Sequence, residues 1–149
     1  MRAVLCALDF NEVSSTVLEV AMEMALLFKA HLTILFSYRL IDHQEMGNIS
    51  ELKSKIEGEA RNRFNDLEQK VLAHHPGVSY EFRTEIGFLS DRIENFTRKN
   101  QVGMIVIGQQ LAENINEHKG LSLHDFISGV KLPVVLVPEE LNVAEFLHE

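Results

Sequence analysis

Five short apolar runs, separated by segments of helical length, constrain the fold of this chain more than any other feature. The runs are residues 3–8, 31–38, 78–86, 102–108 and 132–138. An alternation of buried strands with helices requires right-handed crossovers, so the strands run parallel. The pattern predicts one α/β domain, a single open, doubly wound five-stranded parallel sheet with helices on both faces. Such a fold is Rossmann-like.

The runs also predict which strands are covered on both faces. Four of them contain stretches that are apolar throughout apart from Thr33, which is typical of strands buried in a parallel sheet. We expect these stretches, residues 3–8, 32–36, 104–107 and 134–137, to be buried. Residues 78–86 alternate between apolar and polar, which indicates a strand with one more exposed face.

Helical spacing of apolar residues fills the intervals between the runs. It predicts helices over residues 17–28, over 52–71, after Ser90, and over 123–130. Polar residues at the expected starts are candidate N-caps, because their side chains accept from the first free backbone N–H groups. These candidates are Thr16, Asn48, Ser90 and Ser122. Residues 38–47 read as an irregular loop.

Charge and cysteine content exclude several classes of function. With 14 Lys and Arg against 22 Asp and Glu, the formal net charge is -8. Nucleic acids and anionic membranes repel such a surface, so neither is an expected partner. Cys6 is the only cysteine and lies in an apolar run, so we expect a buried, inert thiol. No signal peptide or membrane-spanning run is apparent, and we expect a cytoplasmic protein.

Three candidate site residues lie at strand ends. Asp9, Ser37 and Gly108 come at the carboxyl ends of three predicted strands, and ligands of open α/β sheets bind at that edge, where the strand order reverses. A polar loop then leads from Gly108 to Gly120, and a helix follows Ser122. A strand, a glycine loop and a helix N-terminus are the parts of a phosphate cradle.

Four segments together resemble the universal stress protein family. They are "VLCALDFNEVSS", "RTEIGFLSDRI", "MIVIGQ" and "LPVVLVP", and they occur in the family's order from Ala3 to Pro138. The resemblance implies an adenine nucleotide alpha hydrolase-like fold, a domain over residues 1–138, and a role in the stress response. Residues 139–149 are left as an acidic tail or a short surface helix.

The loop departs from the motif of the nucleotide-binding members of that family. Their pattern is Gly, two residues, Gly, nine residues, then Gly and Ser or Thr. Gly108 matches its first glycine, Leu111 replaces the second, and Gly120 fits the third with one residue missing from the loop. Leu121 replaces the hydroxyl residue, and Ser122 comes one place late. The resemblance is therefore to the branch that does not bind nucleotide, and we expect no cofactor.

Local charge supports this interpretation. Between residues 109 and 125, Glu113, Glu117 and Asp125 oppose only Lys119, so the sum is 1 − 3 = −2. A triphosphate would be repelled unless a metal intervened. Leu111 also places a branched side chain where a phosphate would approach. If a nucleotide binds nevertheless, the resemblance implies contacts from Asp9, Ser37, Gly108, Gly120 and Ser122.

Simpler roles compete for the same polar residues. Asp9 either receives a ribose or adenine edge, or hydrogen-bonds the turn at residues 11–14 and caps the first helix, and we favour the second role. Ser122 is either a phosphate donor or an N-cap, and we favour the cap. His118 and His124 with Glu117 and Asp125 match no standard metal motif, so we expect no metal site. No catalytic residue can be assigned from spacing.

Three functions remain in order of preference. The first is a non-catalytic, cytoplasmic stress-response protein that forms a homodimer. The fifth strand of the resembled family pairs with its own copy at a sheet edge, which implies an interface of Val134, Val135, Leu136 and Val137. The second is a switch that binds ATP or AMP, or a weak ATPase. The third is an adaptor whose acidic surface binds a protein partner that the sequence does not identify.

Overall fold

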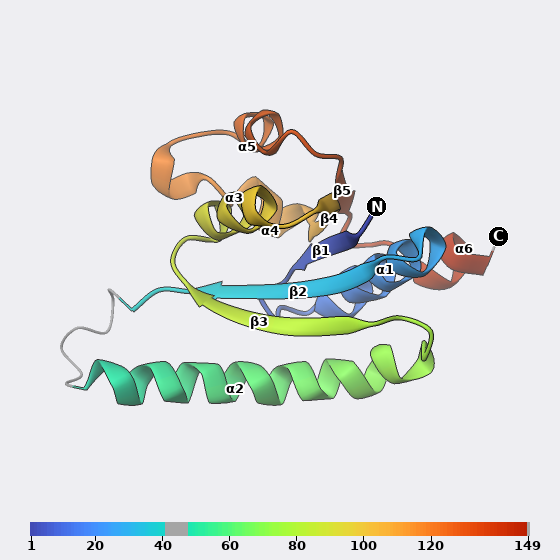
Figure 1. Ribbon diagram of the computed structural model, residues 1–149, viewed down its shortest axis with the longest axis horizontal. Helices are drawn as coiled ribbons and strands as arrows, with labels where there is room; N and C mark the ends of the chain where they lie inside the picture. Colours follow the sequence, from blue (N-terminus) through green and yellow to red (C-terminus); the bar gives the residue numbers. More distant parts are fainter. Residues whose placement is uncertain (41–47, 149) are drawn as a thin grey trace.

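The computed structural model describes residues 1–40 and 48–148 of the chain (Figure 1). Most of the loop expected over residues 38–47 lies outside the described residues. The strands are β1 (Ala3–Ala7), β2 (His31–Tyr38), β3 (Tyr80–Ile86), β4 (Val102–Gly108) and β5 (Val134–Val137). The helices are α1 (Ser14–Phe28), α2 (Ile49–Lys70), α3 (Leu89–Lys99), α4 (Gln109–Glu113), α5 (Leu123–Val130) and α6 (Val143–His148), with 3-10 turns η2 (Leu72–His74) and η3 (Glu117–Lys119).

The strands form one parallel sheet in the order β3-β2-β1-β4-β5. From β1 the chain first adds β2 and β3 on one side and then crosses to add β4 and β5 on the other. The strand order therefore reverses between β1 and β4. The fold predicted from the sequence is confirmed, including the parallel direction of all five strands.

Two apolar clusters cover the two faces of the sheet. One contains α1, the buried face of α2 and the residues of β1 and β2 beneath them, with Cys6 among its fully buried members. The other contains α3, α4 and α5 over the opposite side chains of the same strands. Figure 1 shows α3, α4 and α5 on one side of the sheet and α2 on the other. Burial raises the pKa of the Cys6 thiol, which keeps it protonated and inert, as expected.

The long helix α2 is held to the sheet by few residues. Ala60, Phe64 and Leu67 are its buried residues, and Phe64 stacks on Phe82 of β3 with ring centroids 4.4 Å apart. Two tyrosines add polar anchors. The Tyr80 hydroxyl donates to Glu68 at 2.6 Å, and the Tyr38 hydroxyl donates to Glu57. Burial and then the bond to Glu57 raise the pKa of Tyr38, and the bond to Glu68 and then burial raise the pKa of Tyr80. Both tyrosines therefore keep their protons at neutral pH.

Two of the predicted caps are wrong. Helix α1 begins at Ser14, two residues before Thr16, and its N-cap Val13 has no capping side chain. Asn11 supplies the acceptor before α1, because its side-chain oxygen accepts a hydrogen bond from the Val13 N–H at 3.0 Å. Helix α3 begins at Leu89, so Ser90 lies inside its first turn and faces the core. Asn48 does cap α2, with its side chain accepting from Ser50 and Glu51.

The expected burial is wrong at β5 and at one end of α1. Val134, Val135 and Leu136 are only half-buried, and Val137 alone is buried, because β5 pairs with β4 on one side and forms an edge. Phe28 is 44% exposed at the C-terminal end of α1. The other three predicted apolar stretches are buried apart from half-buried positions at their ends.

The structure contains one helix that the sequence pattern did not predict. It also shows whether the C-terminal segment is a tail or a short helix. Helix α4 occupies the start of the segment read as a polar loop. Residues 143–148 form α6, so the short-helix alternative holds for that part of the tail, and α6 contacts α1. Among the described helices, none is both long and apolar enough to cross a membrane.

Introducing a carboxylate at Val106 tests the central position of β4. Val106 is fully buried and pairs with Cys6 on one side and Val135 on the other. We expect Val106→Asp to cost more than about 4 kcal/mol, because the charge has no partner there. Urea unfolding monitored by circular dichroism measures this loss.

The matched control is Gln101→Asp, at an exposed position just before the same strand. It should change the free energy of unfolding by less than about 0.5 kcal/mol. A Val106→Asp protein that unfolds as cooperatively and at the same urea concentration as the control contradicts the assigned strand order.

Candidate functional site

The register of the sheet brings three of the predicted site residues to one edge. Ala7 of β1 pairs with Leu35 of β2 and with Ile107 of β4. Asp9, Ser37 and Gly108 follow these positions, so all three lie at the carboxyl edge of the sheet. Asp9 and Gly108 flank the point where the strand order reverses, which is where open α/β sheets bind ligands.

Asp9 is exposed and engages the turn that follows it. One of its carboxylate oxygens accepts the backbone N–H of Asn11 and the other accepts the Asn11 side-chain amide, both at 3.4 Å. Between them Phe10 adopts a left-handed conformation with φ of 58°, an unusual value for an aromatic residue. The expected contact of Asp9 with the turn is thus observed at Asn11, but Asp9 does not cap the first helix, because α1 begins at Ser14 and the Val13 N–H before it is accepted by the Asn11 side chain.

Gly108 has a packing reason to be glycine. Its φ of -64° is open to any residue, but a Cβ atom there would lie 3.3 Å from the Val17 side chain of α1. Helix α4 starts at the next residue. Its Leu111 is half-buried and packs against the apolar cluster on the α3 side of the sheet. The position that the motif reserves for a second glycine is therefore occupied by a half-buried leucine that packs on the edge of the core.

Gly120 belongs to a segment that is tied to α3. It ends η3 with a φ of 66°, a left-handed conformation that favours glycine. The preceding Lys119 binds Asp91 in the first turn of α3 at 2.6 Å. That contact, followed by the nearby His118 and Arg92 charges, holds the pKa of Asp91 below its usual value. Gly120 thus serves the local turn of a loop that is fastened to α3.

Ser122 is the N-cap of α5. Its side chain accepts the backbone N–H of Asp125 at 3.2 Å, and the Asp125 carboxylate accepts the Ser122 backbone N–H at 2.9 Å. The same carboxylate also accepts the Ser122 hydroxyl proton at 2.8 Å. These bonds lower the pKa of Asp125. The hydroxyl is engaged in this capping box, which agrees with the capping role favoured from the sequence.

Two adjoining hollows lie at the reversal point of the strand order, and both are acidic. Their volumes are about 390 and 370 Å³, and they share Gln110 and Glu139. The charged residues that line them are all glutamates, four in number, with no lysine or arginine: Glu12, Glu113, Glu139 and Glu140. Sequence reasoning found Glu113 and missed the other three, which come from the β1–α1 turn and the segment after β5.

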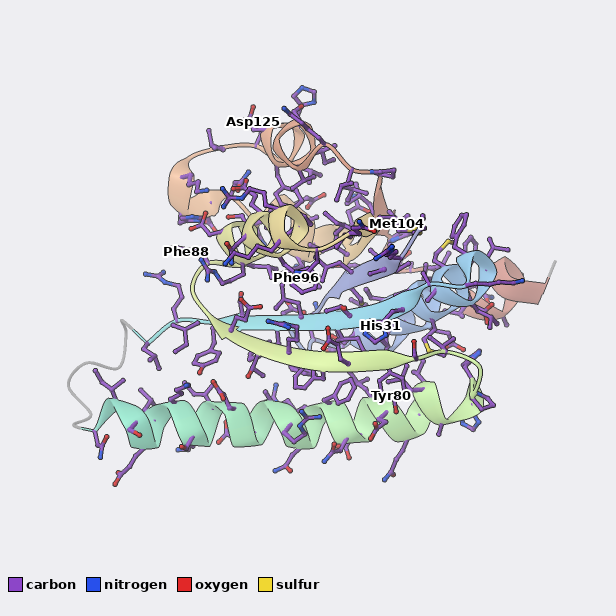
Figure 2. All side chains as sticks on the ribbon, viewed as in Figure 1. His31, Tyr80, Phe88, Phe96, Met104 and Asp125 are labelled. Atoms are coloured by element: carbon purple, nitrogen blue, oxygen red, sulfur yellow. The ribbon has the colours of Figure 1, made fainter. Side chains whose placement is uncertain are left out.

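A polar cluster around His31 lies at the amino ends of the strands, at the end of the sheet away from Asp9 and Gly108. The sequence predicted no ligand site there. His31 Nδ1 lies 3.0 Å from the Ser79 hydroxyl, and its Nε2 lies 3.9 Å from the Glu81 carboxylate. Figure 2 shows His31 toward the amino ends of the strands, far from Phe88 at the start of α3. The group is exposed and borders none of the hollows described here, so it lacks a place for a substrate. Within residues 1–40 and 48–148, no three His, Cys, Asp or Glu side chains gather as a metal site.

Comparison with protein-family models places the whole sheet in one family. The model described as "Universal stress protein family" matches residues 1–138. No curated protein sequence matches the chain significantly. The family match covers all five strands and ends at Pro138, just after β5.

Solved structures share the fold at low sequence identity. A universal stress protein family member from Burkholderia pseudomallei is 24% identical, with a TM-score of 0.65 over 91% of this chain and 95% of that one. Universal stress protein UspA from Lactobacillus plantarum is 17% identical, with a TM-score of 0.69 over 91% and 97%. A universal stress protein from Archaeoglobus fulgidus, in complex with dAMP, is 18% identical, with a TM-score of 0.62 over 92% and 98%.

Removing the Ser122 hydroxyl tests whether this residue acts as a cap. We expect Ser122→Ala to lower the free energy of unfolding by about 1 kcal/mol, because α5 loses an N-terminal acceptor. Urea unfolding is the measurement. Ser128→Ala, in the exposed middle of the same helix, is the matched control and should be neutral or slightly stabilising. Equal stabilities of the two variants would argue against the capping role.

Proposed function

The chain belongs to the universal stress protein family, and we propose that it is a member that acts without bound nucleotide, as a non-catalytic homodimer in the stress response. The observation that carries this proposal is helix α4. It begins directly after β4, in the segment that the family's nucleotide-binding motif uses as a flexible phosphate loop. A cytoplasmic location, as expected from the sequence, is part of the proposal.

Helix α4 opposes phosphate binding for steric reasons. A phosphate loop needs backbone N–H groups that point outward and no side chain between them and the ligand. In α4 the backbone is helical, and Leu111 is drawn into the apolar cluster beneath it. Opening this loop for a ligand would expose the buried part of Leu111, which is half-buried, so the cost is a fraction of the about 1.5–3 kcal/mol that fully burying a leucine contributes. Nucleotide binding would have to offset that cost.

The charges at the reversal point oppose phosphate as well. The two hollows carry four glutamates and no basic residue. Two like charges 4 Å apart repel by about 1 kcal/mol in water and by more near a protein surface. A triphosphate would meet several such repulsions. In phosphate sites a lysine or arginine beside the phosphates usually offsets such repulsion. No lysine or arginine is among the residues that line these two hollows.

One observation favours the alternative, a nucleotide-binding switch. Asp9, Ser37 and Gly108 do share the carboxyl edge, and the Archaeoglobus fulgidus relative with the same fold is in complex with dAMP. A nucleotide with a single phosphate carries less charge and so meets less repulsion than ATP. The binding experiment below therefore includes AMP.

The proposal of a homodimer rests on β5. This strand is an edge of the sheet, its four residues are all apolar, and three of them are only half-buried. An unpaired edge with apolar side chains invites pairing with another chain. An isologous contact needs a patch that complements itself, and an uncharged strand meets that condition. Pro133 and Pro138 limit the length of any such pairing.

Titration calorimetry with ATP and magnesium, and separately with AMP, tests the absence of nucleotide. We expect a dissociation constant above roughly 100 μM for each, equivalent to less than about 5.5 kcal/mol of binding free energy. A low-micromolar constant for either nucleotide would overturn the proposal. In that case Asp9→Ala should weaken the binding, which would place the nucleotide at the predicted edge.

A gain-of-binding variant tests the reason for the loss. Leu111→Gly with Glu113→Gln removes the half-buried leucine that packs α4 on the core and one carboxylate, and we expect it to bind ATP more tightly than the wild type does. Asn114→Gly with Glu113→Gln is the matched control, because it loosens the same segment but leaves Leu111 in place. Equal affinities of the two double variants would show that Leu111 is not the obstacle.

Sedimentation equilibrium tests the dimer. We expect the wild type to sediment at twice 17.0 kDa, and Val135→Lys or Leu136→Lys, on opposite faces of β5, to shift the equilibrium toward monomer. Gln101→Lys, which adds the same charge at an exposed position, is the control. A wild-type mass near 17.0 kDa at high micromolar concentration contradicts the proposal, and a dimer untouched by both β5 substitutions contradicts this interface.

A further inference from the structure

A third hollow at the carboxyl edge differs in character from the two acidic ones. It lies on the other side of α4, between that helix, the start of α3 and the end of β2, and its volume is about 430 Å³. This is within the range of small-molecule sites, roughly 300–1,000 Å³. Its apolar lining is made by Phe88, Leu89, Leu111 and Ile115. Figure 2 shows Phe88 at the start of α3, at the end of the sheet toward which β2 and β3 run.

A three-layered stack forms one wall of this hollow. The Arg39 guanidinium lies 3.9 Å from the centre of the Phe88 ring, and the His118 ring lies 3.6 Å from it on a nearly parallel plane, at 5°. Stacking holds a guanidinium flat and leaves the N–H groups on its edge available as a two-pronged donor. The Asp91 carboxylate lies 3.8 Å from His118 Nε2, close to it but beyond hydrogen-bond distance. The wall is therefore built from contacts among its own side chains.

The electrostatics of the hollow favour an anion. Arg39 is half-buried, whereas Glu117, the only carboxylate in the lining, is exposed and more strongly screened by solvent. Helix α3 begins at the same place with no side-chain hydrogen bond to its first N–H groups, and the one carboxylate in that turn, Asp91, is paired with Lys119 at 2.6 Å.

We propose that this hollow binds a small organic anion with an apolar body, such as a medium-chain carboxylic acid. The carboxylate accepts hydrogen bonds from the edge of the Arg39 guanidinium, a geometry that suits two oxygens. The apolar chain lies on Leu89, Leu111 and Ile115. The site does not use Asp9, Gly108 or the acidic hollows, so it stands whether or not a nucleotide binds at the reversal point.

Titration of ¹⁵N-labelled protein with octanoate, followed by NMR, tests this proposal. We expect saturable shifts of the backbone amides of Phe88, Leu89, Asn114, Ile115 and His118. Arg39→Gln should weaken the binding about tenfold or more, because it removes a charge-assisted bond to the carboxylate. Octylamine has the same chain with the opposite charge, and it should leave these amides unshifted. The spectra also show whether each variant is folded.

Arg98→Gln is the matched control, since it removes the same charge from the far end of α3. It should bind octanoate as the wild type does. An equal loss of affinity in both variants would mean that octanoate responds only to net charge, which overturns the site. So would shifts centred on the exposed residues Leu26–Phe28, equal shifts with octylamine, or the absence of any saturable shift with a dissociation constant below about 10 mM.

Discussion

The pairing of β1 with β2 on one side and β4 on the other is the interaction on which the rest of this structure depends. Residues 4–7 of β1 are at most 1% exposed, and their backbone groups have no water to bond with. Buried backbone groups must find partners, and here the two neighbouring strands supply them. Because both pairings are parallel, the connections are crossovers. The crossovers are right-handed, and those before and after the reversal run in opposite directions along the sheet, so α1 and α3 lie on opposite faces.

The same pairing determines where a ligand site can form, and the residues around it then decide its chemistry. Asp9 and Gly108 reach the reversal point because β1 and β4 end together there. Gly108 is explained by its approach to Val17, and Gly120 by a left-handed turn. Two glycines of a nucleotide motif can thus persist for structural reasons alone. A glycine in such a loop is evidence for phosphate binding only when its backbone faces an open cradle.

Helix α4 divides the carboxyl edge into two environments. On one side its polar residues Gln109, Gln110 and Glu113 line the acidic hollows, and on the other Leu111 lines the hollow with Arg39 and His118. An amphipathic turn of only five residues therefore separates a region that repels anions from one that attracts them. Its short length makes this arrangement depend on the apolar anchor at Leu111 rather than on helix propensity.

The sequence by itself determined the fold class, the parallel direction of the strands and the end of the sheet where Asp9, Ser37 and Gly108 lie, because period and burial are local properties of the chain. It also indicated the cap at Ser122, whose partner Asp125 is three residues away.

Tertiary structure alone decided that β5 is half-exposed, that Ser90 faces the core, and that Glu12, Glu139 and Glu140 join Glu113. It alone brought Arg39, Phe88 and His118 into one stack. These residues come from separate turns, and no spacing along the chain encodes contacts that exist only once the strands have been ordered side by side.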